Sequence, residues 1–353
     1  MKLDRATRWS KLLKLPKNPQ PLKDFPADCE HPDKEAIHKD CQEVDKTFAR
    51  FEESELKDYL EYLVTVFCLQ KGIPYTSGIH YLLAPFFLIG FSSLNKAYAA
   101  FCSFIKKMTP RAFKEKSSLE YTYKLFHSLL MYHEPFVCNF LDANMLTPQD
   151  YSHEWFVCLF ATRINISILL AFWETCLQEN NFTLPYFVGL VVIARQKEKI
   201  LSKRNLEGGA FDFSIDELEE MDSVYQEAIN LQYQTPRTFI TIIEQLTLHS
   251  PESFYVEVIQ KSIGLPILAS DVQYPKPGLF VIDLRKAPEY LSGHYPQSFN
   301  IPKDLNLSTG KLYIDRGTME CVNRFFFTFH LQNFKALSLC YLQRTPPQRS
   351  QVR

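Results

Sequence analysis

The sequence is short of glycine, with 11 residues among 353, and it has no pair of cysteines in a C-x-x-C spacing. Few glycines mean few tight turns, while 29 Phe and 18 Tyr supply large side chains that fill the gaps between packed helices. Most of the nine cysteines lie inside apolar runs, where a thiol behaves as a small hydrophobic group. We therefore expect a helical protein in a reducing compartment, with no disulfide, no metal and no cofactor.

Apolar runs long enough to cross a membrane are also missing. The longest, IHYLLAPFFLIGF and LPYFVGLVVIA, fall short of the roughly 20 residues that a transmembrane helix needs. The N-terminus scatters charges among its apolar positions, unlike a secretory signal. The net charge is −1, and no RNP, zinc-finger or helix-turn-helix signature is present. These features predict a cytoplasmic protein with no transmembrane segment and no nucleic-acid partner.

Apolar residues recur with helical spacing through the first two-thirds of the chain. Residues 54–71 carry an apolar stripe at i, i+3, i+4 and i+7, and Gly72 and Pro74 follow as stop signals. Similar runs lie at 79–90, 94–108, 118–132, 135–141, 150–161, 166–178 and 184–203. Strand-like alternation does not appear before about residue 245. The pattern predicts one all-α domain over residues 1–245.

The character of the sequence changes beyond that point. We expect residues 246–270 to form a helical linker. From 271 to 340, short β-favouring runs such as the one in PKPGLFVIDLR alternate with a short helical segment, which predicts a small α/β unit. The tail, 341–353, loses apolar periodicity and is predicted to be disordered.

Several fragments of the helical part follow one family pattern in order and spacing. Its residues are Arg5 and Trp9 in R-x-x-x-W, Ile37 and Asp40 in I-x-x-D, Tyr75 and Gly78 in IPYTSGIHYLLAPF, and the later fragments WFVCLFA, Trp173-Glu174 and LPYFVGLVVIA. Together they resemble the TBC domain, the helical domain of GTPase-activating proteins for Rab GTPases, over about residues 1–245. In that family the aspartate is a scaffold residue, and we expect Asp40 to hydrogen-bond nearby backbone.

The resemblance implies GTP hydrolysis in trans, by an arginine that neutralises charge on the γ-phosphoryl group and a glutamine that places the attacking water. Helical spacing puts the arginine position three residues after Asp40, where this chain has Glu43, and the glutamine position carries Ser77. The domain is therefore predicted to be catalytically degenerate. The alternative is an active GTPase-activating protein with a displaced finger such as Arg50, although seven helical residues would separate it from position 43 by roughly 10 Å.

The C-terminal unit resembles a rhodanese domain. The residues that carry this resemblance are Asp283 and Arg285 in D-x-R, Gly293 and His294 in G-H, and the tripeptide NIP at 300–302. The strand KLYI is followed by Asp315, Arg316, Gly317 and Thr318, where an active rhodanese needs a cysteine. We therefore expect a truncated, inert rhodanese-like domain, in which His294 pins a loop to its neighbouring strand.

A degenerate TBC domain followed by a degenerate rhodanese domain resembles one branch of TBC proteins. That branch binds golgins, the coiled-coil tethers of the trans-Golgi network, so the resemblance implies capture of endosome-derived vesicles on the cytosolic face of that membrane. A Rab GTPase is a second candidate partner. The basic cluster of Lys106, Lys107, Arg111, Lys114 and Lys116 is either a solvated face or a dock for an acidic golgin segment.

Overall fold

A computed structural model of the chain describes most residues up to 262 and short stretches beyond. The described residues are 4–17, 19, 22, 29–113, 116–202, 211, 213–249, 252–262, 265–266, 271, 282–283, 287–294 and 299–300.

The described elements are almost all helices. The first group is α1 (Arg5–Leu12), α2 (Lys34–Gln42), the 3-10 turns η2 (Val44–Lys46) and η3 (Ala49–Glu52), α3 (Ser54–Lys71), α4 (Ile79–Leu83), α5 (Pro85–Leu88) and α6 (Leu94–Met108). Next come α7 (Lys116–His133), α8 (Pro135–Ala143), α9 (Pro148–Val157), α10 (Ile166–Glu179), α11 (Leu184–Arg195), α12 (Lys197–Ser202), α13 (Leu218–Gln234), α14 (Arg237–Thr247) and α15 (Ser253–Lys261). The last are β1 (Ile282–Asp283), α17 (Ala287–Leu291) and β2 (Phe299–Asn300).

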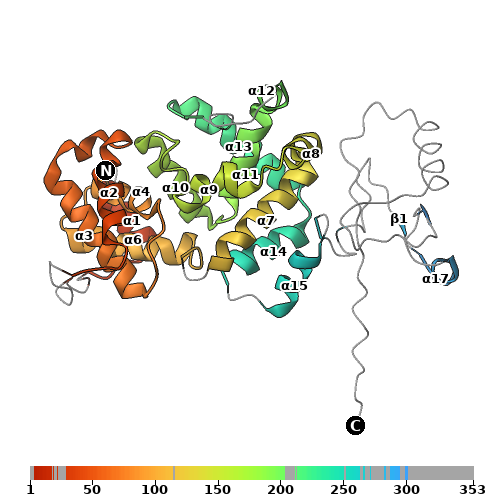
Figure 1. Ribbon diagram of the computed structural model, residues 1–353, viewed down its shortest axis with the longest axis horizontal. Coiled ribbons are helices and arrows are strands. Elements are labelled where there is room, and N and C mark those ends of the chain that lie inside the picture. Colours follow the sequence, from red (N-terminus) through yellow and green to blue (C-terminus); the bar gives the residue numbers. More distant parts are fainter. Residues whose placement is uncertain are drawn as a thin grey trace, which may run out of the picture.

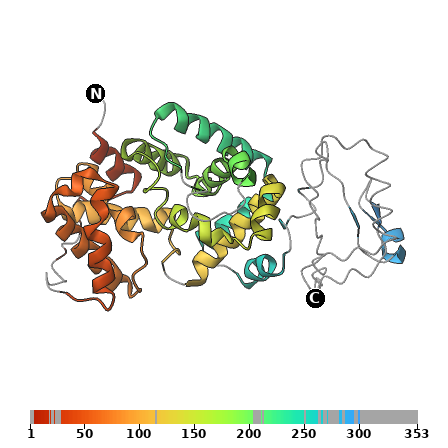
Figure 2. The same cartoon turned by 45° about the horizontal axis from the view of Figure 1, so that its top comes forward.

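The helices pack around one core and form an elongated body. In both ribbon views α1–α4 and α6 gather at one end, while α7, α8 and α14 lie toward the other (Figures 1 and 2). The short elements β1 and α17 lie beyond that second end (Figure 1). None of the described helices combines the length and the apolar character needed to span a bilayer.

The predicted all-α architecture of the larger unit is confirmed, and apolar periodicity located its helices well. The runs 54–71 and 94–108 match α3 and α6 in both bounds. Gly72 adopts a left-handed conformation (φ 61°, ψ 40°) and caps α3, as its stop signal predicted. The run 79–90 is instead two short helices, because Pro85 starts a new one at its N1 position.

The N-terminal helix α1 is held against α10 by a buried contact between Trp9 and Glu174. Trp9 is fully buried and packs edge-on against Phe86, with ring centroids 5.5 Å apart. Its indole Nε1 donates to Glu174 Oε1 at 2.6 Å, and the guanidinium of Arg8 donates to Oε2 at 2.7 Å. Arg5 lies 3.5 Å from the same carboxylate. The R-x-x-x-W fragment therefore joins the first helix to the Trp173-Glu174 fragment.

Residues beyond 245 continue the helical core before any strand begins. The predicted linker, 246–270, contains α15, which packs against α7 and α14 and buries Ile259 completely. Farther on, β1 and β2 pair in parallel, with Ile282 opposite Phe299 and α17 between the two strands. Two residues per strand do not define a rhodanese fold, so that part of the prediction stays a prediction.

Candidate functional site

Position 43 lies where α2 ends. Glu43 is the C-cap of this helix, with a side chain 47% exposed, and its carboxylate pairs with Lys46 Nζ at 2.7 Å. Because Lys46 donates to it, the pKa of Glu43 is lowered and the side chain is ionised at neutral pH. From α3, Lys57 Nζ donates to the Gln42 carbonyl at 2.7 Å, which satisfies a free carbonyl at the negative end of the helix.

Asp40, one turn before the end of α2, accepts hydrogen bonds from the loop that precedes α4. The hydroxyls of Tyr75 and Ser77 donate to its Oδ2 at 2.9 and 2.7 Å. We expected Asp40 to bind backbone, but the hydrogen bonds that it accepts come from two side chains. Backbone is bound instead by Asp33, whose Oδ2 accepts from the Tyr75 N–H at 2.9 Å. Two aspartates thus hold this loop against α2.

His80 is the buried member of this cluster. It is 2% exposed, and its Nδ1 lies 2.9 Å from the Tyr75 hydroxyl and 3.9 Å from Asp40 Oδ2. Burial lowers the pKa of His80 to about 4, against a smaller opposite effect of Asp40, so the ring is neutral at physiological pH. Burial also raises the pKa of Tyr75 far above its ordinary value, which keeps its hydroxyl proton available to Asp40. We call Asp40, Tyr75, Ser77 and His80 the Asp40 cluster.

Gly78 lets the loop turn into α4 beside α9. Its φ of 107° is rarely adopted by residues with a side chain, and a Cβ there would lie 2.6 Å from Val157 Cγ1. A larger residue there requires the Val157 side chain to shift. Gly78 therefore fixes the path of the loop that carries its neighbour Ser77.

The alternative finger, Arg50, does not extend α2. The helix ends at Gln42, and Arg50 is an exposed residue of the separate 3-10 turn η3, so the assumed helical rise of seven residues does not apply. The chain leaves the helical path to bury Val44 and Phe48. Two other described arginines are paired elsewhere, Arg163 with Glu154 at 3.1 Å and Arg195 with Glu227 at 2.6 Å.

The basic cluster does not form one exposed face. Arg111 is only 8% exposed, and its guanidinium donates to the His249 carbonyl at 2.9 Å. Lys107 donates to the Leu12 carbonyl at 2.7 Å, and its pKa is lowered mainly by burial. Lys106 is exposed, Lys114 lies outside the described residues, and Lys116 starts α7. The prediction that Arg111 takes part in a surface dock is therefore wrong.

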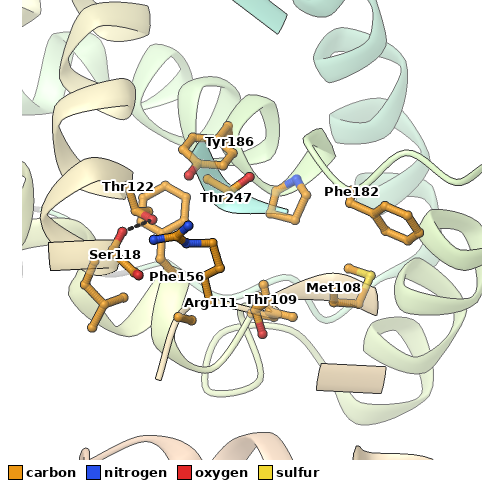
Figure 3. Close-up of a pocket in the computed structure, with 13 residues that line it drawn as sticks. Met108, Thr109, Arg111, Ser118, Thr122, Phe156, Phe182, Tyr186 and Thr247 are labelled. Carbon is orange, nitrogen blue, oxygen red and sulfur yellow. Dashed lines mark hydrogen bonds between the residues drawn. The ribbon is translucent and has the colours of Figure 1, made fainter. Parts of the chain in front are cut away.

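Arg111 instead lines a small internal cavity of about 40 Å³ between α7, α9 and α11 (Figure 3). Phe156 and Tyr186 form part of its wall, and Thr122 Oγ1 donates to the Ser118 carbonyl at 3.1 Å. A space of this size suits one or two water molecules rather than a cofactor. We read the cavity as part of the packing around a buried guanidinium.

Few of the predicted rhodanese residues can be placed. Arg285 and the loop of Asp315, Arg316, Gly317 and Thr318 lie outside the described residues. Asp283 is in β1. Among the described residues, the contacts of His294 are with Tyr290: its Nδ1 lies 3.1 Å from the Tyr290 carbonyl, and the two rings stack at 4.0 Å. The predicted contact of His294 with a neighbouring strand stays a prediction.

Sequence reasoning missed His80 and Asp33. His80 stands between apolar residues in the fragment GIHYLL, and a titratable residue inside such a run is a signal of a buried polar contact. Asp33 stands directly before α2, a position where aspartate is common as a helix cap. Its bond to Tyr75 spans 42 positions, which no local pattern reveals.

The relatives of this chain include proteins that share one name. The chain is 22% identical over 276 residues to the TBC domain-containing protein kinase-like protein of Homo sapiens, and 24% identical over 249 residues to that of Dictyostelium discoideum. These alignments cover 65% and 67% of this chain, but only 31% and 23% of the relatives. The chain thus spans less than a third of their length. Their name is not that of the golgin-binding branch that the degenerate TBC and rhodanese-like units resemble.

Two solved structures and one family model also match this chain. The Ypt/Rab-GAP domain of Gyp1p aligns over 65% of this chain and 81% of its own, with a TM-score of 0.49 and 12% identity. The flagellar RabGAP TBC domain of Chlamydomonas aligns over 64% and 71%, with a TM-score of 0.42 and 12% identity. The Rab-GTPase-TBC domain family matches residues 5–201, more than half of the sequence. This chain belongs to the Rab-GTPase-TBC domain family.

Proposed function

We propose that this TBC domain binds a Rab GTPase without accelerating GTP hydrolysis, and so acts as an interaction scaffold. One feature supports the proposal above all: Glu43, exposed at the end of α2, stands at the position where the family resemblance expects the arginine finger. Its negative charge opposes the charge that develops on the γ-phosphoryl group, which an arginine would stabilise. An arginine finger accelerates GTP hydrolysis by about 10³ to 10⁵, so a domain without one loses most of the rate enhancement.

Ser77 supports the same proposal at the position that would place the attacking water. Its hydroxyl donates to Asp40 at 2.7 Å, so the proton that could orient a water is already used within the protein. A serine side chain is also shorter than a glutamine. The Asp40 cluster keeps a folded surface while offering neither of the groups that the reaction needs.

The competing function is an active GTPase-activating protein with a displaced finger. Single-turnover GTP hydrolysis by a panel of Rab GTPases, with and without the full chain, separates the two. We expect less than about a twofold change for every Rab, since without a finger the partner hydrolyses at its intrinsic rate. Acceleration of tenfold or more for any Rab, abolished by Arg50→Ala or by Arg163→Ala, would establish the displaced finger and end the scaffold proposal.

Glu43→Arg tests whether the remaining surface is intact. We expect this single change to leave hydrolysis near the intrinsic rate, because Ser77 still leaves the water unplaced. The double variant with Ser77→Gln is the matched comparison and is expected to exceed the single one. Strong stimulation by Glu43→Arg alone would show that position 77 does not limit the reaction.

A golgin tether at the trans-Golgi network is the second partner that we propose, because a degenerate TBC domain followed by a rhodanese-like sequence resembles the golgin-binding TBC branch. This would place the protein at the cytosolic face of that membrane, where it captures endosome-derived vesicles through its partners. A pull-down with purified golgin ends, and with Rab GTPases loaded with GTP or GDP, distinguishes the two partners. Capture of a Rab but of no golgin end would remove the golgin part and leave the Rab scaffold.

A further inference from the structure

Three side chains that commonly bind transition metals converge between α7 and α8. They are His127, Cys138 and Asp142, and one ligand atom from each lies within 4.8 Å of the other two. In the ribbon, α7 and α8 lie at the end of the helical body opposite α2 and α3 (Figure 1). The three residues are therefore remote from the Asp40 cluster, and nothing proposed above uses them.

The local sequence explains this convergence. Cys138 and Asp142 are four residues apart on α8, so their side chains share one face of the helix. His127 comes from α7, which packs against α8. Pro135 begins α8 at its N1 position directly after α7 ends, and this short connection turns the second helix back along the first.

The distances match the edges of a tetrahedral zinc site. His127 Nε2 lies 3.5 Å from Cys138 Sγ and 3.1 Å from Asp142 Oδ2, and Cys138 Sγ lies 3.9 Å from the same Oδ2. Ligands at ordinary zinc distances around a tetrahedral ion are separated by roughly 3.5 Å for sulfur to nitrogen or oxygen and roughly 3.3 Å for nitrogen to oxygen. Movements of a few tenths of an ångström, available to the exposed Asp142 side chain, would complete the geometry.

Charge and exposure suit a divalent ion with one open position. A thiolate and a carboxylate together carry two negative charges, which a doubly charged ion neutralises, and the neutral imidazole adds a third ligand. Cys138 is fully buried, whereas the side chains of His127 and Asp142 are 28% and 44% exposed. The fourth position therefore faces solvent, where a water or a group from outside the domain can bind.

We infer that His127, Cys138 and Asp142 form a site for a zinc-class divalent metal ion, with the fourth position open to solvent. Thiolate, imidazole and carboxylate ligands favour zinc over magnesium or calcium, which prefer oxygen ligands alone. The alternative is an ordinary hydrogen bond between His127 and Asp142 beside a buried thiol.

Titration of the full chain with Co²⁺ under reducing, oxygen-free conditions tests the inference. We expect one equivalent to produce a thiolate-to-cobalt charge-transfer band and the intense visible bands of four-coordinate cobalt, both displaced by Zn²⁺. Cys138→Ala should abolish the charge-transfer band. Asp142→Asn and His127→Gln should each weaken binding by at least about tenfold, since even second-shell changes cost that much in metal sites.

Two variants serve as matched controls. Cys102→Ser removes a half-buried thiol from α6. His38→Gln removes an imidazole that pairs with the Glu61 carboxylate at 2.7 Å, a pair without a thiol. Both should bind Co²⁺ as the unchanged protein does. Asp142→Asn alters an exposed side chain, so its circular dichroism should match the unchanged protein. No charge-transfer band at one equivalent, or a band of equal strength in Cys138→Ala, would overturn the inference.

Discussion

Two regions of this domain carry residues of the TBC family pattern, and they match that pattern to different extents. At the contact between α1 and α10, both residues of R-x-x-x-W are present, and Arg5 and Trp9 contact the buried carboxylate of Glu174. At the end of α2, Asp40 and Gly78 keep their supporting contacts, but the outward positions hold Glu43 and Ser77. The residues that hold the fold are present, whereas under the proposed function those expected to act on a partner are replaced.

This difference follows burial. A buried polar group that loses its partner costs about 1 to 3 kcal/mol, so replacing one member of the Trp9–Glu174 contact destabilises the fold. An exposed side chain at a helix end carries no such penalty. Folding therefore constrains the first region and the support beneath the second, while positions 43 and 77 are free to change with function.

Glu174→Ala should give the largest loss of stability, about 3 kcal/mol, because it leaves the buried indole N–H of Trp9 and two guanidinium groups without their acceptor. Urea unfolding followed by circular dichroism measures the loss. Glu174→Gln is the control, since its amide oxygen can still accept from Trp9 and should lower the cost. A loss below about 1 kcal/mol in the alanine variant would show that this contact is not what the fold depends on.

Gly78→Ala should cost about 2 to 3 kcal/mol, from an unfavourable φ of 107° together with the collision with Val157. Gly72→Ala is a matched control with φ 61° and nothing within 4 Å of the added Cβ, so it carries the backbone part alone, about 1 kcal/mol. Adding Val157→Ala to the Gly78 variant should recover part of the difference. Equal losses for the two single glycine variants would contradict the contact with α9.

Lowering the pH should destabilise the Asp40 cluster through His80. The pKa of His80 in the folded protein is about 4, below its ordinary value of 6.5, so between these values only the unfolded chain takes up the proton. Stability from this residue is complete above pH 6.5 and is lost as the pH falls toward 4. We expect a decrease of about 1 to 2 kcal/mol between pH 7.5 and pH 5. His80→Asn should remove this part of the dependence, and an unchanged slope would exclude His80 as its source.

Local sequence patterns predicted the helices whose ends depend on local residues. The bounds of α3 follow from its apolar stripe and from Gly72, and both could be read from neighbouring positions. The end of α2 could not, because it depends on Lys57 of α3 and on burial of Val44 and Phe48. The assumed helical extension from position 43 to Arg50 was therefore wrong.

Contacts between distant segments limited the prediction of sites. The identity of the residues at 43 and 77 was visible in the sequence, but the binding of Ser77 to Asp40 was not. Arg111 looked like a surface cation and is buried, because composition alone does not tell which side of a turn faces the core. Likewise, the spacing of cysteines could not reveal Cys138, because the nearest side chain able to bind a metal beside it is a histidine on another helix.

The smallest effect on folding should come from Glu43→Arg. The exposed Glu43 caps α2 at its C-terminal end, where a cation interacts favourably with the helix dipole, so thermal unfolding of the variant should match that of the unchanged protein. Asp40→Ala is the contrasting variant, because it removes the acceptor for Tyr75 and Ser77 and should unfold at a clearly lower temperature. If Glu43→Arg melted as early as Asp40→Ala, the fold itself would require the carboxylate. Its presence would then say nothing about lost catalysis, and the contrast between the two regions would fail.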